Sequence, residues 1–132
     1  PLSLTNLTEL VGLYISMNQI NGIIPPKIGN LKNLVSLDLS SNNFEGQIPP
    51  TLGYLPNLTS LDLSHNQLVG TIPSALCLLT NLIHLSIQEN SIEGLIPSEI
   101  GGMKNLINLN LSGNQLISPI RSTLGHLINL RS

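Results

Sequence analysis

A 24-residue pattern that recurs along the chain restricts its fold more than any other feature of the sequence. The stretch LDLSSNNFEGQIPPTLG (37–53) returns as LDLSHNQLVGTIPSALC (61–77). Repeats of roughly 20–50 residues are typical of a solenoid, in which each unit buries its apolar face against the next. We therefore expect one stacked array over residues 1–132, with about five and a half units. One asparagine recurs in each complete unit, at Asn18, Asn42, Asn66, Asn90 and Asn114.

Each unit predicts one short strand and one return segment. In the second unit, Leu37 and Leu39 alternate with polar residues, which is the period of a half-buried strand. The recurring asparagine follows where the chain leaves that strand, and its amide both donates and accepts, so we expect a structural asparagine ladder. A glycine is expected to form a tight corner, and an Ile-Pro pair an extended exit. The segments 50–53 and 74–77 are expected to return as turns or short 3₁₀ pieces.

Composition excludes several classes of function. The net charge is −2 and only 9% of the residues are charged, so there is no polybasic patch for nucleic acid. Aromatic residues make up 2%, too few for the stacking platforms of single-strand binders. No apolar run approaches the roughly 18 residues of a membrane span, so membrane attachment would need a segment outside this chain. We predict no cofactor, no metal and no nucleic-acid partner.

Two units depart from the repeat. Cys77, the single cysteine, stands in the column that holds Gly53, Gly101 and Gly125 elsewhere. We interpret it as a small apolar filler and not as a nucleophile or ligand. The fifth unit has SPIR (118–121) in place of the glycine and Ile-Pro elements, and we expect a local irregularity or bend there.

The columns that vary between units are the candidates for recognition, because the constant columns build the scaffold. On the outward side of stacked parallel strands, neighbours in one column lie roughly 4.8 Å apart. We predict a polar, concave, ladder-like face that binds an extended peptide or a partner protein. Its predicted contact residues are Tyr14, Ser16, Met17, Asp38, Ser40, Asp62, Ser64, His65, His84, Ser86, Gln88, Glu89, Asn108, Asn110 and Ser112.

Two pairs of residues on this face carry specific expectations. Tyr14 and Met17 are the larger, less polar members of their columns. We expect them to form a pocket for a ligand side chain, or to cover a neighbouring unit on their N-terminal side. His65 and Glu89 share a column, and we expect a weak ion pair between them.

Residue types used in catalysis occur on this face, but their arrangement does not favour an enzyme. Asp38 and Asp62 are lateral neighbours on an open surface, where water screens their charges. Asp62, Ser64 and His65 lie in a row along one strand, which leaves serine unable to aim at histidine and offers no oxyanion pocket. We predict no catalytic residue in this segment.

Three N-x-S/T sequons predict glycosylation at Asn6, Asn57 and Asn110 in a secreted protein. Asn57 also belongs to a second asparagine column, so a structural role is the alternative for it. A glycan on Asn110 would block part of the candidate binding face.

The full frame, L-x-x-L-x-L-x-x-N-x-L-x-G-x-I-P-x-x-L-G, resembles the plant extracellular type of leucine-rich repeat over essentially the whole chain. The resemblance implies an α/β leucine-rich repeat solenoid, a curved right-handed coil. A parallel β-sheet would line its concave face, and turns or short 3₁₀ segments its convex face. Paired-cysteine caps normally end such arrays, and both ends of this chain lie inside repeats. We therefore expect that this chain lacks both caps and is a fragment from the middle of a longer extracellular domain, or an incomplete gene product.

The resemblance also implies a function. Such repeats most often form the ectodomain of a receptor-like kinase, which senses an extracellular peptide or protein ligand or pairs with a co-receptor at the plasma membrane. A secreted inhibitor of a cell-wall-degrading enzyme, or a receptor-like protein without a kinase, is the alternative. No kinase motif occurs in this chain, so a serine/threonine kinase domain would lie beyond Ser132.

Overall fold

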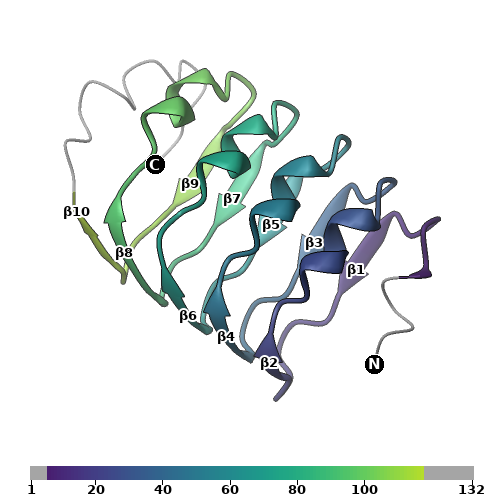
Figure 1. The fold of residues 1–132 in the computed structure, drawn as a ribbon, viewed down its shortest axis with the longest axis horizontal. Coiled ribbons are helices and arrows are strands. Elements are labelled where there is room, and N and C mark those ends of the chain that lie inside the picture. Colours follow the sequence, from purple (N-terminus) through teal and green to yellow (C-terminus); the bar gives the residue numbers. More distant parts are fainter. Residues whose placement is uncertain (1–5, 118–132) are drawn as a thin grey trace.

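The computed structural model describes residues 6–117, which form a curved solenoid of stacked repeats (Figure 1). Each unit contributes a strand to a first sheet and then a strand to a second sheet, and a 3₁₀ segment follows before the next unit begins. No helix among the described residues is long and apolar enough to cross a membrane. The irregularity expected at 118–121, and Gly125, lie outside the described residues.

The first sheet lines the concave face and contains the strand predicted for each unit. Its strands are parallel, in the order β1-β3-β5-β7-β9, and pair with a register of one repeat. The central leucines, such as Leu37 and Leu61, are fully buried, and the residues on either side of them face outward. The strands are β1 (Gly12–Tyr14), β3 (Ser36–Asp38), β5 (Ser60–Asp62), β7 (His84–Ser86) and β9 (Asn108–Asn110).

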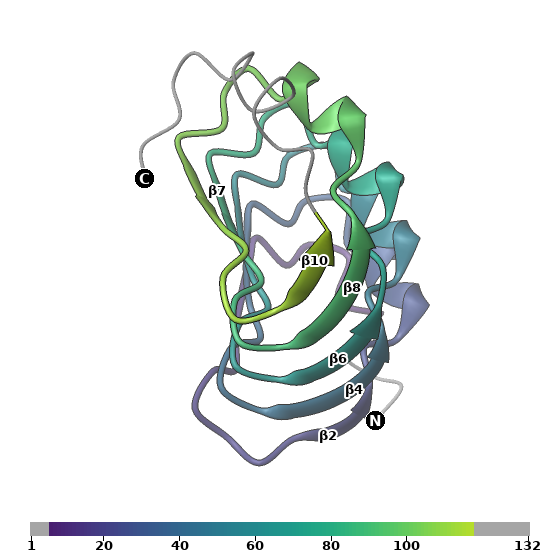
Figure 2. The ribbon, with the colours of Figure 1, turned by 90° about the vertical axis from the view of Figure 1, so that its left-hand side faces the viewer.

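A second parallel sheet, absent from the sequence-based expectation, runs along the side of the solenoid (Figure 2). The repeated glycine lies in these strands and not at a corner, so the prediction of its place is wrong. Gly46 in β4 has a φ of 75°, and a Cβ built on it would lie 3.0 Å from Cγ2 of Ile23 in the neighbouring strand. The strands are β2 (Asn21–Ile23), β4 (Asn43–Gln47), β6 (Gln67–Gly70), β8 (Ser91–Leu95) and β10 (Gln115–Ile117).

The return segments are 3₁₀ helices on the convex face, as predicted. Each begins after a proline with an extended backbone, such as Pro49 at φ −68° and ψ 126°. Gly53 allows two neighbouring segments to approach, because a Cβ there would collide with the backbone oxygen of Ala75. The segments are η2 (Pro26–Asn30), η3 (Pro50–Tyr54), η4 (Ser74–Leu78) and η5 (Ser98–Gly102).

The recurring asparagines join neighbouring units from Asn42 onward, whereas Asn18 in the described structure donates only within its own unit, to the Ile15 and Ser16 carbonyls at 2.9 and 3.0 Å. Asn42 Nδ2 donates to the Ile15 carbonyl of the preceding unit at 2.9 Å, and Asn42 Oδ1 accepts from the Ile20 N–H at 3.1 Å. Every buried side-chain nitrogen or oxygen in the described part of the chain has a hydrogen-bond partner. The same pair of contacts recurs at Asn66, Asn90 and Asn114.

Candidate functional site

The outward residues of the first sheet form straight rows, because the strands pair one repeat apart. Neighbours in a row lie roughly 4.8 Å apart, so side chains from five units form one continuous surface. The structure thus brings the predicted residues together on one face. The central row, in order along the solenoid, is Tyr14, Asp38, Asp62, Ser86 and Asn110.

Hydrogen bonds within each strand end orient the acidic side chains of this row. Asp38 Oδ1 accepts from the backbone N–H of Ser40 at 3.0 Å and from its hydroxyl at 2.6 Å. Asp62 accepts the same two bonds from Ser64 at 2.9 and 2.6 Å. Ser64 is only 2% exposed, so the expectation that its hydroxyl contacts a ligand is wrong: the hydroxyl is turned inward to hold the carboxylate.

The fourth unit has its own pattern of hydrogen bonds. The Ser86 hydroxyl donates to the Gln88 side-chain oxygen, in place of the Asp–Ser pair of the second and third units and the Asn110–Ser112 pair of the fifth. Beside them, Asn108 Nδ2 lies 2.6 Å from His84 Nδ1 across two paired strands. His84 and Asn108 are exposed, so this polar pair is open to a partner.

The residue directly before each ladder asparagine has a left-handed backbone. Met17, Ser41, His65 and Glu89 have φ values of 53–56°, a conformation that costs a side-chain-bearing residue roughly 1–2 kcal/mol. The Glu89 carboxylate lies against Gly113 of the following unit, on the side away from His65. Since no ion pair joins His65 and Glu89 in the described structure, the pairing predicted for them is wrong.

Tyr14 and Met17 project strongly from the face. Met17 is 86% exposed and Tyr14 is 67% exposed. The Tyr14 ring lies back over Gly12, where a Cβ would be 2.7 Å from Cε2 of the ring. Gly12 thus gives the ring the space to lie along the sheet, while its outer side remains open.

The described residues contain a shallow groove of about 400 Å³ beside the concave face, which the sequence analysis missed. Apolar residues directly after the Asn-Leu pair, Ile83 and Ile107, were the signal that would have located it. The groove is lined by Asn57, Thr59, Asn81, Ile83, Asn105 and Ile107.

The second asparagine column borders this groove and has a structural role. Asn81 and Asn105 donate to backbone carbonyls of the preceding unit at 3.1 and 2.8 Å. Asn57 Nδ2 makes the corresponding contact with the Lys32 carbonyl at 3.4 Å, which fits the structural role given above as the alternative to glycosylation. Asn6 and Asn110 are exposed, and glycosylation stays a prediction at all three sequons.

Nucleophilic and metal chemistry find no support in the geometry. The Ser64 hydroxyl donates to Asp62 and not to His65. Burial, with a smaller effect of Glu99, raises the pKa of the half-buried Cys77 thiol to about 11, and the side chain packs against the core. Among residues 6–117, no three His, Cys, Asp or Glu residues are grouped to hold a metal ion.

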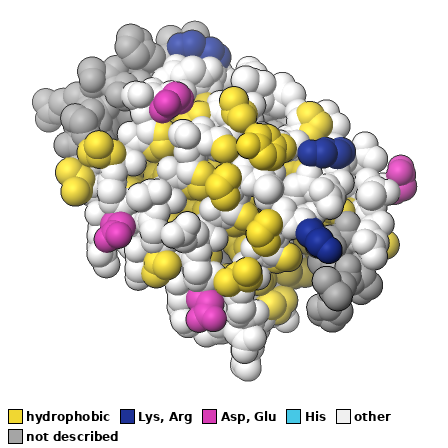
Figure 3. Space-filling model, viewed as in Figure 1, with side chains coloured by type: hydrophobic (Ala, Val, Ile, Leu, Met, Phe, Trp, Pro, Cys, Tyr) yellow, Lys and Arg dark blue, Asp and Glu magenta, His cyan; other side chains and the backbone are white. Residues whose placement is uncertain are grey.

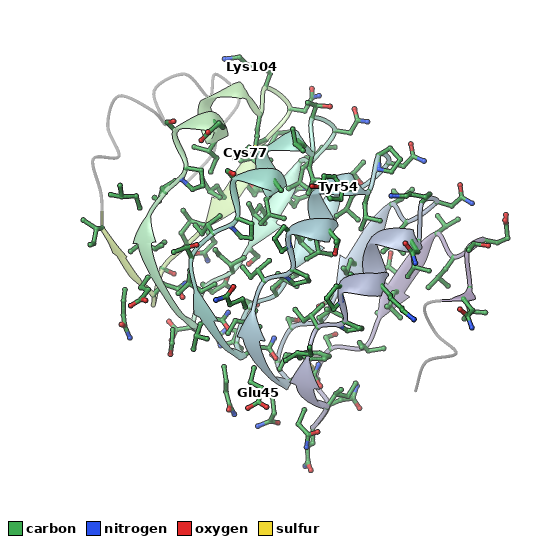
Figure 4. The ribbon with its side chains drawn as sticks, viewed as in Figure 1. Glu45, Tyr54, Cys77 and Lys104 are labelled. Atoms are coloured by element: carbon green, nitrogen blue, oxygen red, sulfur yellow. The ribbon has the colours of Figure 1, made fainter. Side chains whose placement is uncertain are left out.

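The lysines of the described residues are confined to the 3₁₀ side of the solenoid, and acidic side chains are visible in the same view (Figure 3). They are Lys27, Lys32 and Lys104, which lie in or after 3₁₀ segments. The rows of the concave face contain aspartate, glutamate and histidine but neither lysine nor arginine. Figure 4 places Tyr54 and Cys77 on the 3₁₀ side and Glu45 at the second sheet, away from these rows.

Comparison with known proteins assigns the repeats. Models of the leucine-rich repeat match residues 9–31, 33–55 and 56–116, whereas no curated protein matches the chain by sequence. The plant peptide hormone receptor RGFR1 in complex with RGF2 is 40% identical, with a TM-score of 0.96 over 99% of this chain and 21% of that one. The Arabidopsis receptor kinase HAESA, in complex with the peptide hormone IDA and the co-receptor SERK1, is 34% identical, with a TM-score of 0.84 over 88% of this chain and 20% of that one.

A shorter relative shows the same likeness. The ectodomain of the receptor kinase SOBIR1 from Arabidopsis thaliana is 40% identical, with a TM-score of 0.82 over 89% of this chain and 64% of that one. The present chain therefore spans about a fifth of the two hormone receptors and less than two thirds of SOBIR1.

Proposed function

Because this chain belongs to the leucine-rich repeat family of the plant extracellular type, we propose that it is a non-catalytic ligand-binding segment of a plant cell-surface receptor. Its ligand is an extracellular peptide or protein, and a leucine-rich repeat co-receptor is the second kind of partner. The segment lies on the extracellular face of the plasma membrane, and the membrane span and the kinase belong to other parts of the receptor.

One observation carries this proposal. The outward side chains of five parallel strands form continuous rows of half-buried and exposed residues, most of them with hydrogen-bonding groups, at a spacing that an extended peptide can follow. The similarity to ectodomains whose structures contain peptide hormones supports a peptide-binding role for this chain.

Selection of binders from a random peptide library on the immobilised chain tests the proposal. Peptides recovered on the wild-type chain are titrated against Ser86→Arg, which places a long side chain in the central row. Glu93→Arg is the matched control, because the same side chain is then added to β8 of the second sheet. We expect Ser86→Arg to weaken binding at least about tenfold and Glu93→Arg to leave it unchanged. Failure to recover binders, or binders indifferent to Ser86→Arg, would refute a peptide-binding concave face.

The receptor context needs a separate experiment, which is to read the encoding transcript on both sides of this segment. A membrane span and kinase motifs downstream would establish a receptor kinase, and a membrane span alone a receptor-like protein. A stop codon soon after a C-terminal cap would make a secreted inhibitor of a cell-wall-degrading enzyme the working hypothesis.

A further inference from the structure

Two large apolar side chains are exposed at one end of an otherwise polar face. Met17 and Tyr14 have the highest exposed fractions, 86% and 67%, of the large hydrophobic residues in the described structure. Both belong to the first unit of the concave sheet or to the turn that follows its strand. Burying the outer side of the Tyr14 ring under an apolar side chain of a ligand would be favourable, and its inner side already rests over Gly12.

The next two positions of the same row offer negative charge. Asp38 and Asp62 use Oδ1 to accept their serine hydrogen bonds, and Oδ2 of each has no hydrogen-bond partner in the described structure. The two residues are direct strand partners, so their backbones lie roughly one strand spacing, 4.8 Å, apart and both carboxylates face the same side of the sheet. A guanidinium group has several N–H donors in one plane and can donate to both carboxylates.

No cation of the described chain competes for these carboxylates. The lysines of the described segment lie on the 3₁₀ side. In the first three units, the residues around the two aspartates on the concave face are serines, Gly12, Tyr14, Met17 and His65. The charge of this part of the face is therefore complementary to a basic ligand.

The spacing of the row determines where the basic residue must stand in the ligand. From Tyr14 to the midpoint of Asp38 and Asp62 is one and a half strand spacings, roughly 7 Å. In an extended peptide, side chains two residues apart point the same way and are roughly 6.6 Å apart. An apolar side chain on Tyr14 thus places the side chain two residues away over the aspartate pair.

We propose that the concave face binds an extended peptide that carries an apolar residue on Tyr14 and an arginine or lysine two residues away on Asp38 and Asp62. This inference rests on the proposed function and names the class of ligand for the same face. Met17 covers the flank of the apolar residue. Asparagine is a conservative test residue at both aspartates, because Asn110 Oδ1 already accepts the corresponding bonds from Ser112 at 3.1 and 2.7 Å.

The sequences of the selected peptides provide the test. On the wild-type chain we expect enrichment of Arg or Lys two residues from an apolar residue. A repeated selection on the double variant Asp38→Asn, Asp62→Asn is expected to lose the basic enrichment and keep the apolar one. A basic binder from the first selection should bind the double variant about tenfold more weakly, and should lose affinity as salt is raised.

Two controls distinguish a failure of this inference from a failure of peptide binding itself. Glu45→Gln removes one negative charge from the second sheet and is expected to leave the affinity unchanged, and a thermal melt verifies that the double variant is folded. The inference would be overturned if the selected peptides lacked an Arg or Lys two residues from an apolar residue. It would also be overturned if selection on the double variant still enriched that basic residue. Peptide binding would stand in both cases. An absence of binders in every selection would overturn peptide binding itself, and this inference with it.

Discussion

Replacing Asn66 by alanine tests how the ladder stabilises the solenoid. Asn66 Nδ2 donates to three carbonyls at 3.0–3.1 Å, and Oδ1 accepts from the Phe44 N–H at 3.0 Å. At about 1 kcal/mol for each net hydrogen bond, a simple count gives a loss of roughly 4 kcal/mol. The three carbonyls belong to Leu39, Leu63 and Ser64.

The structure predicts a smaller loss, because each carbonyl has a second donor. Leu39 and Leu63 also accept from the ladder asparagines of the neighbouring units, and Ser64 accepts from a backbone N–H. Only the Phe44 N–H loses its acceptor, and one buried unsatisfied donor costs about 1–3 kcal/mol. We expect Asn66→Ala to lower the free energy of unfolding by about 2 kcal/mol in urea denaturation.

Hydrogen exchange locates the effect, and a second asparagine is the control. The Phe44 amide is expected to exchange faster in Asn66→Ala, while the amides of the concave strands stay protected. Asn57→Ala removes an exposed amide with a single contact at 3.4 Å, and is expected to cost less than about 0.5 kcal/mol. A loss near 4 kcal/mol, or equal losses in the two variants, would show that the reasoning about shared acceptors is wrong.

Four further predictions concern the backbone and the thiol. Gly53→Ala is expected to lower the free energy of unfolding by about 2–4 kcal/mol in urea denaturation, because the added Cβ would collide with a backbone oxygen of η4. Gly102→Ala is the control and is expected to change it by less than about 0.5 kcal/mol, because the space around Gly102 is open. Ser41→Gly is expected to raise the thermal midpoint by relieving a φ of 53°, and Ser41→Val to lower it; equal midpoints would contradict the assigned strain. Because burial raises the pKa of Cys77 to about 11, labelling by a disulfide reagent is expected to be slow at pH 8. Rapid labelling of the folded chain at pH 8 would refute the burial of the thiol. Because the unfolded thiol ionises near pH 9 and the folded one near pH 11, the free energy of unfolding is expected to fall as the pH rises from about 9 to about 11.

The period of the sequence was enough to predict the concave sheet, the core and the ladder. Every unit repeats the contacts of the previous one. Leu37 therefore pairs with Leu61 one repeat away, and Asn42 and Asn66 each donate to a carbonyl of the preceding unit. The second sheet escaped prediction, because NFEGQ (43–47) contains an internal glycine and little alternation. Its pairing depends on the close approach of stacked units, which Gly46 permits and which no single unit reveals.

The candidate site was predictable in its rows but not in its side-chain directions. A column assignment says which residues share a face, and the strand pairing agrees with it. It does not say that the Ser64 hydroxyl turns inward to Asp62, or that Glu89 leans over Gly113 and away from His65. Those directions follow from hydrogen bonds and backbone conformation at each strand end, which a repeat frame leaves open.

The central row also explains how such a face can change its ligand without loss of fold. The hydrogen bonds that hold Asp38 in place need only one acceptor oxygen, and the amide of Asn110 provides it equally well. Charge at this position is therefore independent of the local structure, because Asp and Asn make the same contacts with the following serine. Exchange between them adds or removes a negative charge from the surface while the strand end keeps its geometry. The charge at positions 38 and 62 can therefore change while the serines that donate to these side chains keep the strand ends in place.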